Sequence, residues 1–205
     1  MEERRNDTIE ERRRAGRWVL GVVTSWAVTT LVAGRLGLYE HLVGPGFAAV
    51  IVLGVLLPVL VIGRTPGLRA WGRGASIETL TLLHVWRVPA ALVFFEHGDV
   101  LPETFVRNAA FGDFFVGCAA PLVVLAGGGR GKWWLFHVLG ALDLVLAVGT
   151  GLTLTLLGDP RMAAITRFPL VLVPALGVCL TGVAHAIAFD KPAGDRTAST
   201  HAVAT

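Results

Sequence analysis

Several residues that can do chemistry lie inside apolar stretches of this 205-residue chain. The segment LTLLHVWRVPAALVFF places Arg87 three residues after His84, within the apolar run 80–95. An arginine at the centre of a membrane helix costs at least about 2.5 kcal/mol on insertion scales, so it requires a partner, a water-filled cavity or a functional role. Residues three apart project from one face of a helix, and these two therefore predict a polar site on it.

A partner for Arg87 is available in another apolar stretch. Asp143 lies within residues 133–157. If both stretches cross a bilayer as helices, the rise of 1.5 Å per residue puts Arg87 and Asp143 each about 15 Å deep. We therefore predict an ion pair between them. The structural alternative is that this pair only holds two helices in register.

Three histidines share the same half of the predicted bundle: His84, His137 and His185. Their matching depth makes them candidate ligands for a divalent metal ion or for haem. The alternative is ordinary hydrogen bonding between helices. Both cysteines, Cys118 and Cys179, lie nearer the opposite side, so we do not expect them to join these ligands.

Asp113, in the motif FGDFFVG, is expected in the first turn of a span, where a carboxylate interacts favourably with the helix N-terminus. It is either a cap or an outer gate on a path to Arg87. The predicted pocket or binding site thus consists of His84, Arg87, Asp143 and His185, with Asp113 at its outer rim.

Composition indicates the architecture that must position these residues. The chain is 54% hydrophobic and 16% charged, against about 25% charged residues in soluble proteins. We predict an all-α integral membrane bundle with six spans in residues 18–189, a charged tail in residues 1–17 and a disordered tail in residues 190–205. A short extra helix is predicted at residues 102–108, starting at Pro102. The spans are expected at 18–34, 47–63, 77–96, 113–126, 133–157 and 169–189.

Basic residues predict the orientation. Lys and Arg are concentrated on the side that holds both termini, so the positive-inside rule places both termini in the cytoplasm. The bilayer is the expected partner. The sequence has no basic element with interleaved exposed aromatics, which argues against nucleic-acid binding.

The stretch HVWRVPAALVFFEHGDVLPETFVRNAAFGDFFVGCAAP, with LGALDLVLAVGTG and RFPLVLVPALGVCLTGVAHAIA, resembles small bacterial multi-pass membrane proteins of unassigned function. The resemblance covers roughly residues 77–189 and implies a bacterial inner-membrane location. It brings no reaction with it. The residues that carry it are His84, Arg87, Pro102, Gly112, Asp113, Asp143, Pro169, Pro174 and His185.

Three functions stay open at this point. The leading hypothesis is a buried polar pocket that binds or moves a small solute, an ion or a proton. The second is a redox protein or enzyme of the membrane that holds haem or a divalent metal through His84, His137 and His185. The third is a non-catalytic assembly subunit whose polar pairs serve packing alone. No nucleophile elbow, phosphate loop or HExxH motif occurs to identify a reaction.

Overall fold

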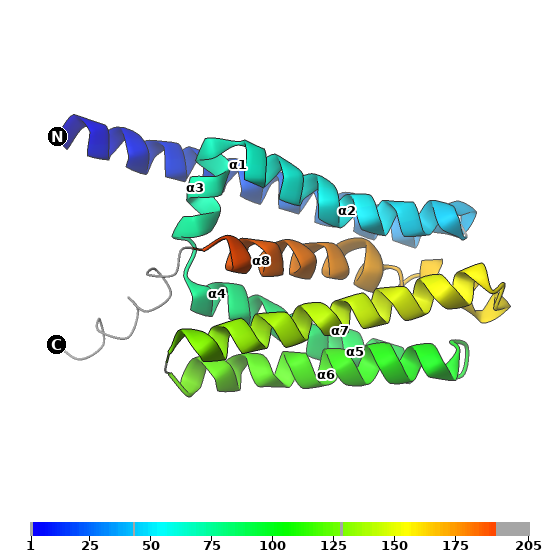
Figure 1. Cartoon of the computed structure of the whole chain (residues 1–205). Helices are drawn as coiled ribbons and strands as arrows, with labels where there is room; N and C mark the ends of the chain where they lie inside the picture. Colours follow the sequence, from blue (N-terminus) through cyan, green and yellow to red (C-terminus); the bar gives the residue numbers. More distant parts are fainter. Residues whose placement is uncertain (1, 43, 128, 192–205) are drawn as a thin grey trace.

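A computed structural model describes residues 2–42, 44–127 and 129–191. The predicted tail from residue 192 onward lies outside this range. The described residues form helices joined by short connections, with no strand among them, as the all-α prediction expects (Figure 1).

Six stretches of the described chain are long and apolar enough to cross a membrane, which agrees with the predicted number. Four of them are single helices: α1 (Glu2–Arg35), α2 (Pro45–Arg64), α6 (Glu103–Leu125) and α7 (Arg130–Leu156). Helix α1 continues through the charged segment that was predicted to be a separate tail. The connections contain η1 (Leu38–Leu42), α3 (Pro66–Gly74) and η3 (Pro160–Thr166), none of which was predicted.

The third and sixth apolar stretches are irregular helices. The third consists of α4 (Ile77–Leu82), the 3₁₀ segment η2 (Leu83–Trp86) and α5 (Arg87–Glu96). The sixth begins with the π-helical segment η4 (Val173–Val178) and continues as α8 (Cys179–Asp190). Pro89 and Pro174 lie in or next to these segments, and proline removes a helical hydrogen bond to the carbonyl four residues earlier. This loss favours a local departure from α geometry but does not impose one, because α2 and α6 contain Pro58 and Pro121 and remain α-helical.

These two irregular stretches form the centre of the bundle. In the apolar windows, 44% of the third stretch and 56% of the sixth are buried, against 6% for each of the first two. In Figure 1, α8 lies between the α1–α2 layer and the α6–α7 layer. Residues at the centre of the third and sixth stretches are therefore the ones that the fold shields most completely.

The predicted short helix at residues 102–108 is wrong as a separate element. Pro102 does precede a helix start, but α6 runs without a break from Glu103 to Leu125. The polar residues in the first turns of α6 are accommodated in this continuous helix. Asn108, for example, donates a hydrogen bond from its side-chain nitrogen to the Thr150 hydroxyl of α7 at 3.1 Å.

The end of the bundle where α8 finishes is held by ionic contacts. Arg69 and Arg73 of α3 both donate to the carboxylate of Asp190, through nitrogens 2.6–3.2 Å from its oxygens. The Lys191 ammonium donates to the carbonyl oxygen of Arg73 at 2.6 Å. Helix α3 thereby links α2 to the last helix of the bundle.

Close packing between the irregular stretches leads to a stability prediction. A Cβ atom on Gly177 of η4 would overlap with the Trp86 indole of η2. We expect Gly177→Val to lower the free energy of unfolding by about 1–3 kcal/mol, because overpacking forces side chains and backbone apart. Gly149→Val is the matched control, since a Cβ there meets no atom within 4 Å. Thermal unfolding in detergent, followed by circular dichroism, measures both variants. An unfolding temperature of the Gly177 variant no lower than that of the control would contradict the packing argument.

Candidate functional site

The Arg87 guanidinium lies between two carboxylates. Its Nε donates to Asp113 Oδ1 at 2.5 Å, and its Nη2 donates to Asp143 Oδ2. The side chains of Arg87, Asp113 and Asp143 are 1%, 9% and 15% exposed. We call these three residues the charged triad. The predicted contact between Arg87 and Asp143 is present, and Asp113 adds a second carboxylate that was not predicted to touch Arg87.

Three helices position the triad. Arg87 opens α5 directly after the 3₁₀ segment, Asp113 comes from α6, and Asp143 comes from α7. The Gly140 carbonyl of α7 accepts a further, longer hydrogen bond from Arg87 Nη1 at 3.4 Å. Gly112 leaves the space that the Asp143 carboxylate occupies, because a Cβ there would overlap with it. The close approach of α6 and α7 therefore depends on a residue without a side chain.

The interpretation of Asp113 as a helix cap is wrong. Helix α6 begins at Glu103, so Asp113 lies in its third turn rather than its first. The residue is 6% exposed and is bound directly to Arg87. Its carboxylate is balanced by a guanidinium and not by free amides at a helix N-terminus.

The three candidate ligands converge in a second cluster. His84, His137 and His185 are 0%, 1% and 2% exposed. Each can offer a ring nitrogen such that the three nitrogens lie within 4.8 Å of one another. We call these residues the histidine cluster. It adjoins the charged triad at Gly140, where an added Cβ would lie 2.8 Å from Cε1 of His185.

Thr81 of α4 was not predicted to belong to the site. Its hydroxyl donates to the Ile77 carbonyl at 2.9 Å, and its oxygen lies 3.3 Å from Nε2 of His137. The signal in the sequence was its position one helical turn before His84, which places it at a similar depth. Threonine is common in apolar helices, so type alone did not distinguish it.

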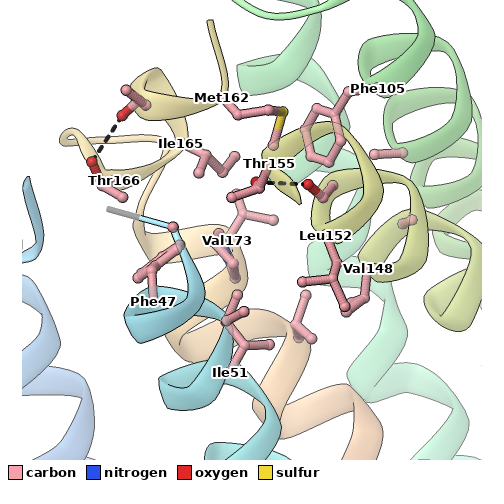
Figure 2. Close-up of a pocket in the computed structure, with 18 of the residues that line it drawn as sticks. Phe47, Ile51, Phe105, Val148, Leu152, Thr155, Met162, Ile165, Thr166 and Val173 are labelled. Carbon is pink, nitrogen blue, oxygen red and sulfur yellow. Dashed lines mark hydrogen bonds between the residues drawn. The ribbon is translucent and has the colours of Figure 1, made fainter. Parts of the chain in front are cut away.

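An apolar cavity of about 260 Å³ lies next to the charged triad. Figure 2 shows the cavity in close-up. Its walls come from α2, α5, α6, α7, η3 and η4. Labelled side chains such as Phe47, Phe105 and Val173 surround the space in Figure 2. Asp113 belongs to the lining, whereas the histidine cluster does not. The sequence did not reveal this cavity, because it forms between apolar faces of six separate segments.

Another carboxylate in the lining is already paired. Asp159, beside Gly158 after the end of α7, lies 2.7 Å from Nη2 of Arg161. The side chain and the backbone N–H of Arg161 donate hydrogen bonds to it, which lowers the pKa of the Asp159 carboxyl. This part of the lining therefore carries a matched pair, in contrast to the triad, where one guanidinium faces two carboxylates.

Residues 45–191 match the family model "Domain of unknown function (DUF8737)". The chain belongs to this family. The matched range begins where α2 begins and covers both clusters and all of the cavity lining except Gly44, whereas α1 lies before it. No curated protein and no solved structure matches the chain.

Within the family domain, the predicted site residues fall into two adjacent groups. Arg87, Asp113 and Asp143 form the charged triad, and His84, His137 and His185 form the histidine cluster. Cys179 belongs to neither group: its thiol lies within hydrogen-bond distance of the carbonyls of Ile51 and Pro174 and can share its one proton between them. The residues that were predicted to line a polar pocket thus pack against one another, and the cavity beside them is apolar.

The triad has one cation and two anions, so removing the cation should lower the free energy of unfolding more than removing one anion. Arg87→Leu leaves two buried carboxylates without their cation, and we expect a loss of about 3–5 kcal/mol in the free energy of unfolding. Asp143→Asn keeps the Arg87–Asp113 pair, and we expect a loss of about 1 kcal/mol. Chemical denaturation in detergent measures both. Arg161→Leu, at the exposed pair, is the control and should leave stability unchanged. Equal losses for the first two variants would contradict the argument.

Proposed function

We propose that this chain is an integral membrane protein that binds a small hydrophobic cation in its cavity in exchange for a proton, and that it moves this solute across the bacterial inner membrane. The observation that carries the proposal is the pairing of one buried guanidinium with two carboxylates beside an apolar cavity.

Membrane insertion is supported by the apolar surface of the bundle. Large hydrophobic side chains are exposed on several helices, among them Leu57 of α2 at 59%, Leu125 of α6 at 82% and Val145 of α7 at 69%. Soluble proteins rarely expose contiguous apolar patches of more than a few hundred Å². A lipid environment accounts for this surface, and the six apolar stretches are long enough to cross it.

Charge balance supports a bound cation or proton. With both carboxylates ionised, the triad carries one more negative than positive charge, and an unbalanced charge is costly in a medium of low dielectric constant. A proton on one carboxyl group removes the excess. A positively charged ligand next to Asp113 removes it equally well.

The cavity favours an organic cation over a hydrated inorganic ion. Its lining around Asp113 is apolar, including Phe47 and Ile51 of α2, Phe94 of α5, and Leu144 of α7. Such a wall cannot replace the water molecules that an inorganic ion would lose. Apolar groups of a ligand would bury surface there, and Asp113 would supply the charged contact that fixes its orientation.

The proton and the organic cation compete for the same excess charge. Asp113 faces Arg87 from the third stretch and Asp143 from α7, with His84 and His185 beyond Arg87. The cavity-lining residues of α2 and η4 are all apolar. When the triad releases its proton as the pH rises, it becomes negative, so cation affinity increases with pH. The increase is at most tenfold per pH unit if one proton is released for each cation bound.

Calorimetric titration with benzyltrimethylammonium tests the proposal. We expect binding to the protein in lipid nanodiscs that strengthens between pH 5 and 9, and a loss of at least tenfold in Asp113→Asn, whose side chain can still accept from Arg87. Asp159→Asn is the matched control, because this carboxylate also lines the cavity but has its own arginine partner.

Neopentylbenzene, the neutral isostere of that ligand, separates charge recognition from apolar partition, and empty nanodiscs correct for partition into lipid. Equal affinity for the charged and neutral ligands refutes the proposal. Unchanged affinity in Asp113→Asn does so as well, because the excess charge then plays no part.

The proposed orientation, with both termini in the cytoplasm, has a separate test. In a background of Cys118→Ser and Cys179→Ala, we expect Leu36→Cys to react with a membrane-impermeant thiol reagent in intact bacterial cells. Arg130→Cys, at the opposite end of the bundle, should react after permeabilisation. Both positions are exposed. The reverse labelling pattern would mean that the positive-inside rule fails for this chain.

A further inference from the structure

The histidine cluster combines three rings from three different parts of the chain. His84 comes from η2, His137 from α7 and His185 from α8. The ring centroids of His84 and His185 lie 4.2 Å apart, and those of His84 and His137 lie 5.6 Å apart. Nothing in the charged triad or the cavity requires three buried imidazoles at this place.

Several ring nitrogens of the cluster are unsatisfied. Among the described residues, Nδ1 and Nε2 of His84 and Nε2 of His185 have no hydrogen-bond partner and are shielded from solvent. A buried polar atom without a partner costs about 1–3 kcal/mol. A neutral imidazole has one lone pair to offer, so a bound species that accepts electron pairs would remove this cost at one nitrogen of His84.

Thr81 determines where the proton of His137 lies. A hydroxyl has a single proton to donate, and Thr81 donates it to the Ile77 carbonyl. The Thr81 oxygen therefore accepts from Nε2 of His137, which leaves the lone pair of the neutral ring on Nδ1. That Nδ1 lies 3.0 Å from Nδ1 of His185.

We infer that His84, His137 and His185 bind one divalent transition-metal ion, of the class to which zinc belongs. Nitrogens that share a tetrahedral zinc ion at about 2.0–2.1 Å lie about 3.3 Å apart, close to the separation of the two Nδ1 atoms. Three neutral imidazoles leave a fourth position for hydroxide or water. Thr81 acts as the outer hydrogen-bond acceptor that orients one ligand, as is usual for metal-bound histidine.

A haem held between two of these histidines does not fit this arrangement. Two axial ligands bind iron from opposite faces of the porphyrin, whereas the three rings pack against one another with centroids 4.2–5.6 Å apart. This spacing suits a single ion.

The metal site also bears on the proposed function, and this step rests on it. The charged triad adjoins the cluster at Gly140, so its excess negative charge favours a cation at either place. A doubly charged ion in the cluster therefore weakens binding of an organic cation in the cavity, and by linkage the organic cation weakens metal binding by the same factor.

Metal loading of the purified full-length protein tests the site directly. We expect one Zn²⁺ per chain after loading and desalting, measured by mass spectrometry of the metal, and the strong visible absorption of four-coordinate Co²⁺ when cobalt is the probe. His137→Ala should lower the affinity for Zn²⁺ at least tenfold, and Thr81→Val should lower it about 10–100-fold. His41→Ala, at an exposed histidine, is the control.

Circular dichroism tests whether each variant is folded. If His137→Ala does not fold, His137→Gln, which keeps more side-chain volume, replaces it. Folded wild-type protein without stoichiometric Zn²⁺ overturns the metal site. Equal Zn²⁺ affinity in wild type and the His137 variant does the same.

The coupling is measured by titrating benzyltrimethylammonium with and without saturating Zn²⁺. We expect a lower affinity with Zn²⁺ in wild type. We expect a smaller decrease in His137→Ala, because its weaker site is only partly loaded at a Zn²⁺ concentration that just saturates wild type. Stoichiometric Zn²⁺ in a protein that binds no organic cation supports the metal site and refutes the proposed function. Organic-cation binding in a protein that takes up no Zn²⁺ refutes the metal site and leaves the proposed function intact.

Discussion

The buried guanidinium of Arg87 is the interaction on which the rest of the structure depends. It lies at the centre of one of the two most buried stretches, where its charge is tolerated because carboxylates of α6 and α7 both contact it. These contacts hold three helices at one level and require α6 and α7 to approach closely at Gly112. The two carboxylates also exceed the one cation, so the contact that stabilises the core leaves a charge for a further group to balance.

Irregular helix geometry brings the second polar group beside the first. The 3₁₀ turn of η2 carries His84 and Trp86, and the π turn of η4 provides Gly177, against which the Trp86 indole packs. Proline lies in or beside each turn and favours the departure from α geometry. Such departures are common at functional sites, and here they occur in the two stretches that supply Arg87, His84 and His185.

The two clusters and the cavity make different chemical demands. The triad requires a group that balances its charge, and the cavity accommodates apolar groups. The histidines require a group that accepts electron pairs from their ring nitrogens. A hydrophobic cation next to Asp113 and a metal ion at the histidines each satisfy one of these demands. Because Gly140 contacts Arg87 and lies against His185, the two sites share one electrostatic environment. Their occupancies are therefore expected to oppose each other.

The sequence by itself determined the helical class, the six apolar stretches and the pairing of Arg87 with Asp143, because hydropathy and helical rise are local properties that convert directly into depth. It also singled out the three histidines as residues at one level. Tertiary structure alone decided that Asp113 is a partner of Arg87, since the uninterrupted course of α6 moves it from the first turn to the third. The role of Thr81, the unsatisfied histidine nitrogens and the apolar cavity depend on how helix faces meet. Depth along an axis does not specify the rotation or the neighbours of a helix, and these are set by packing.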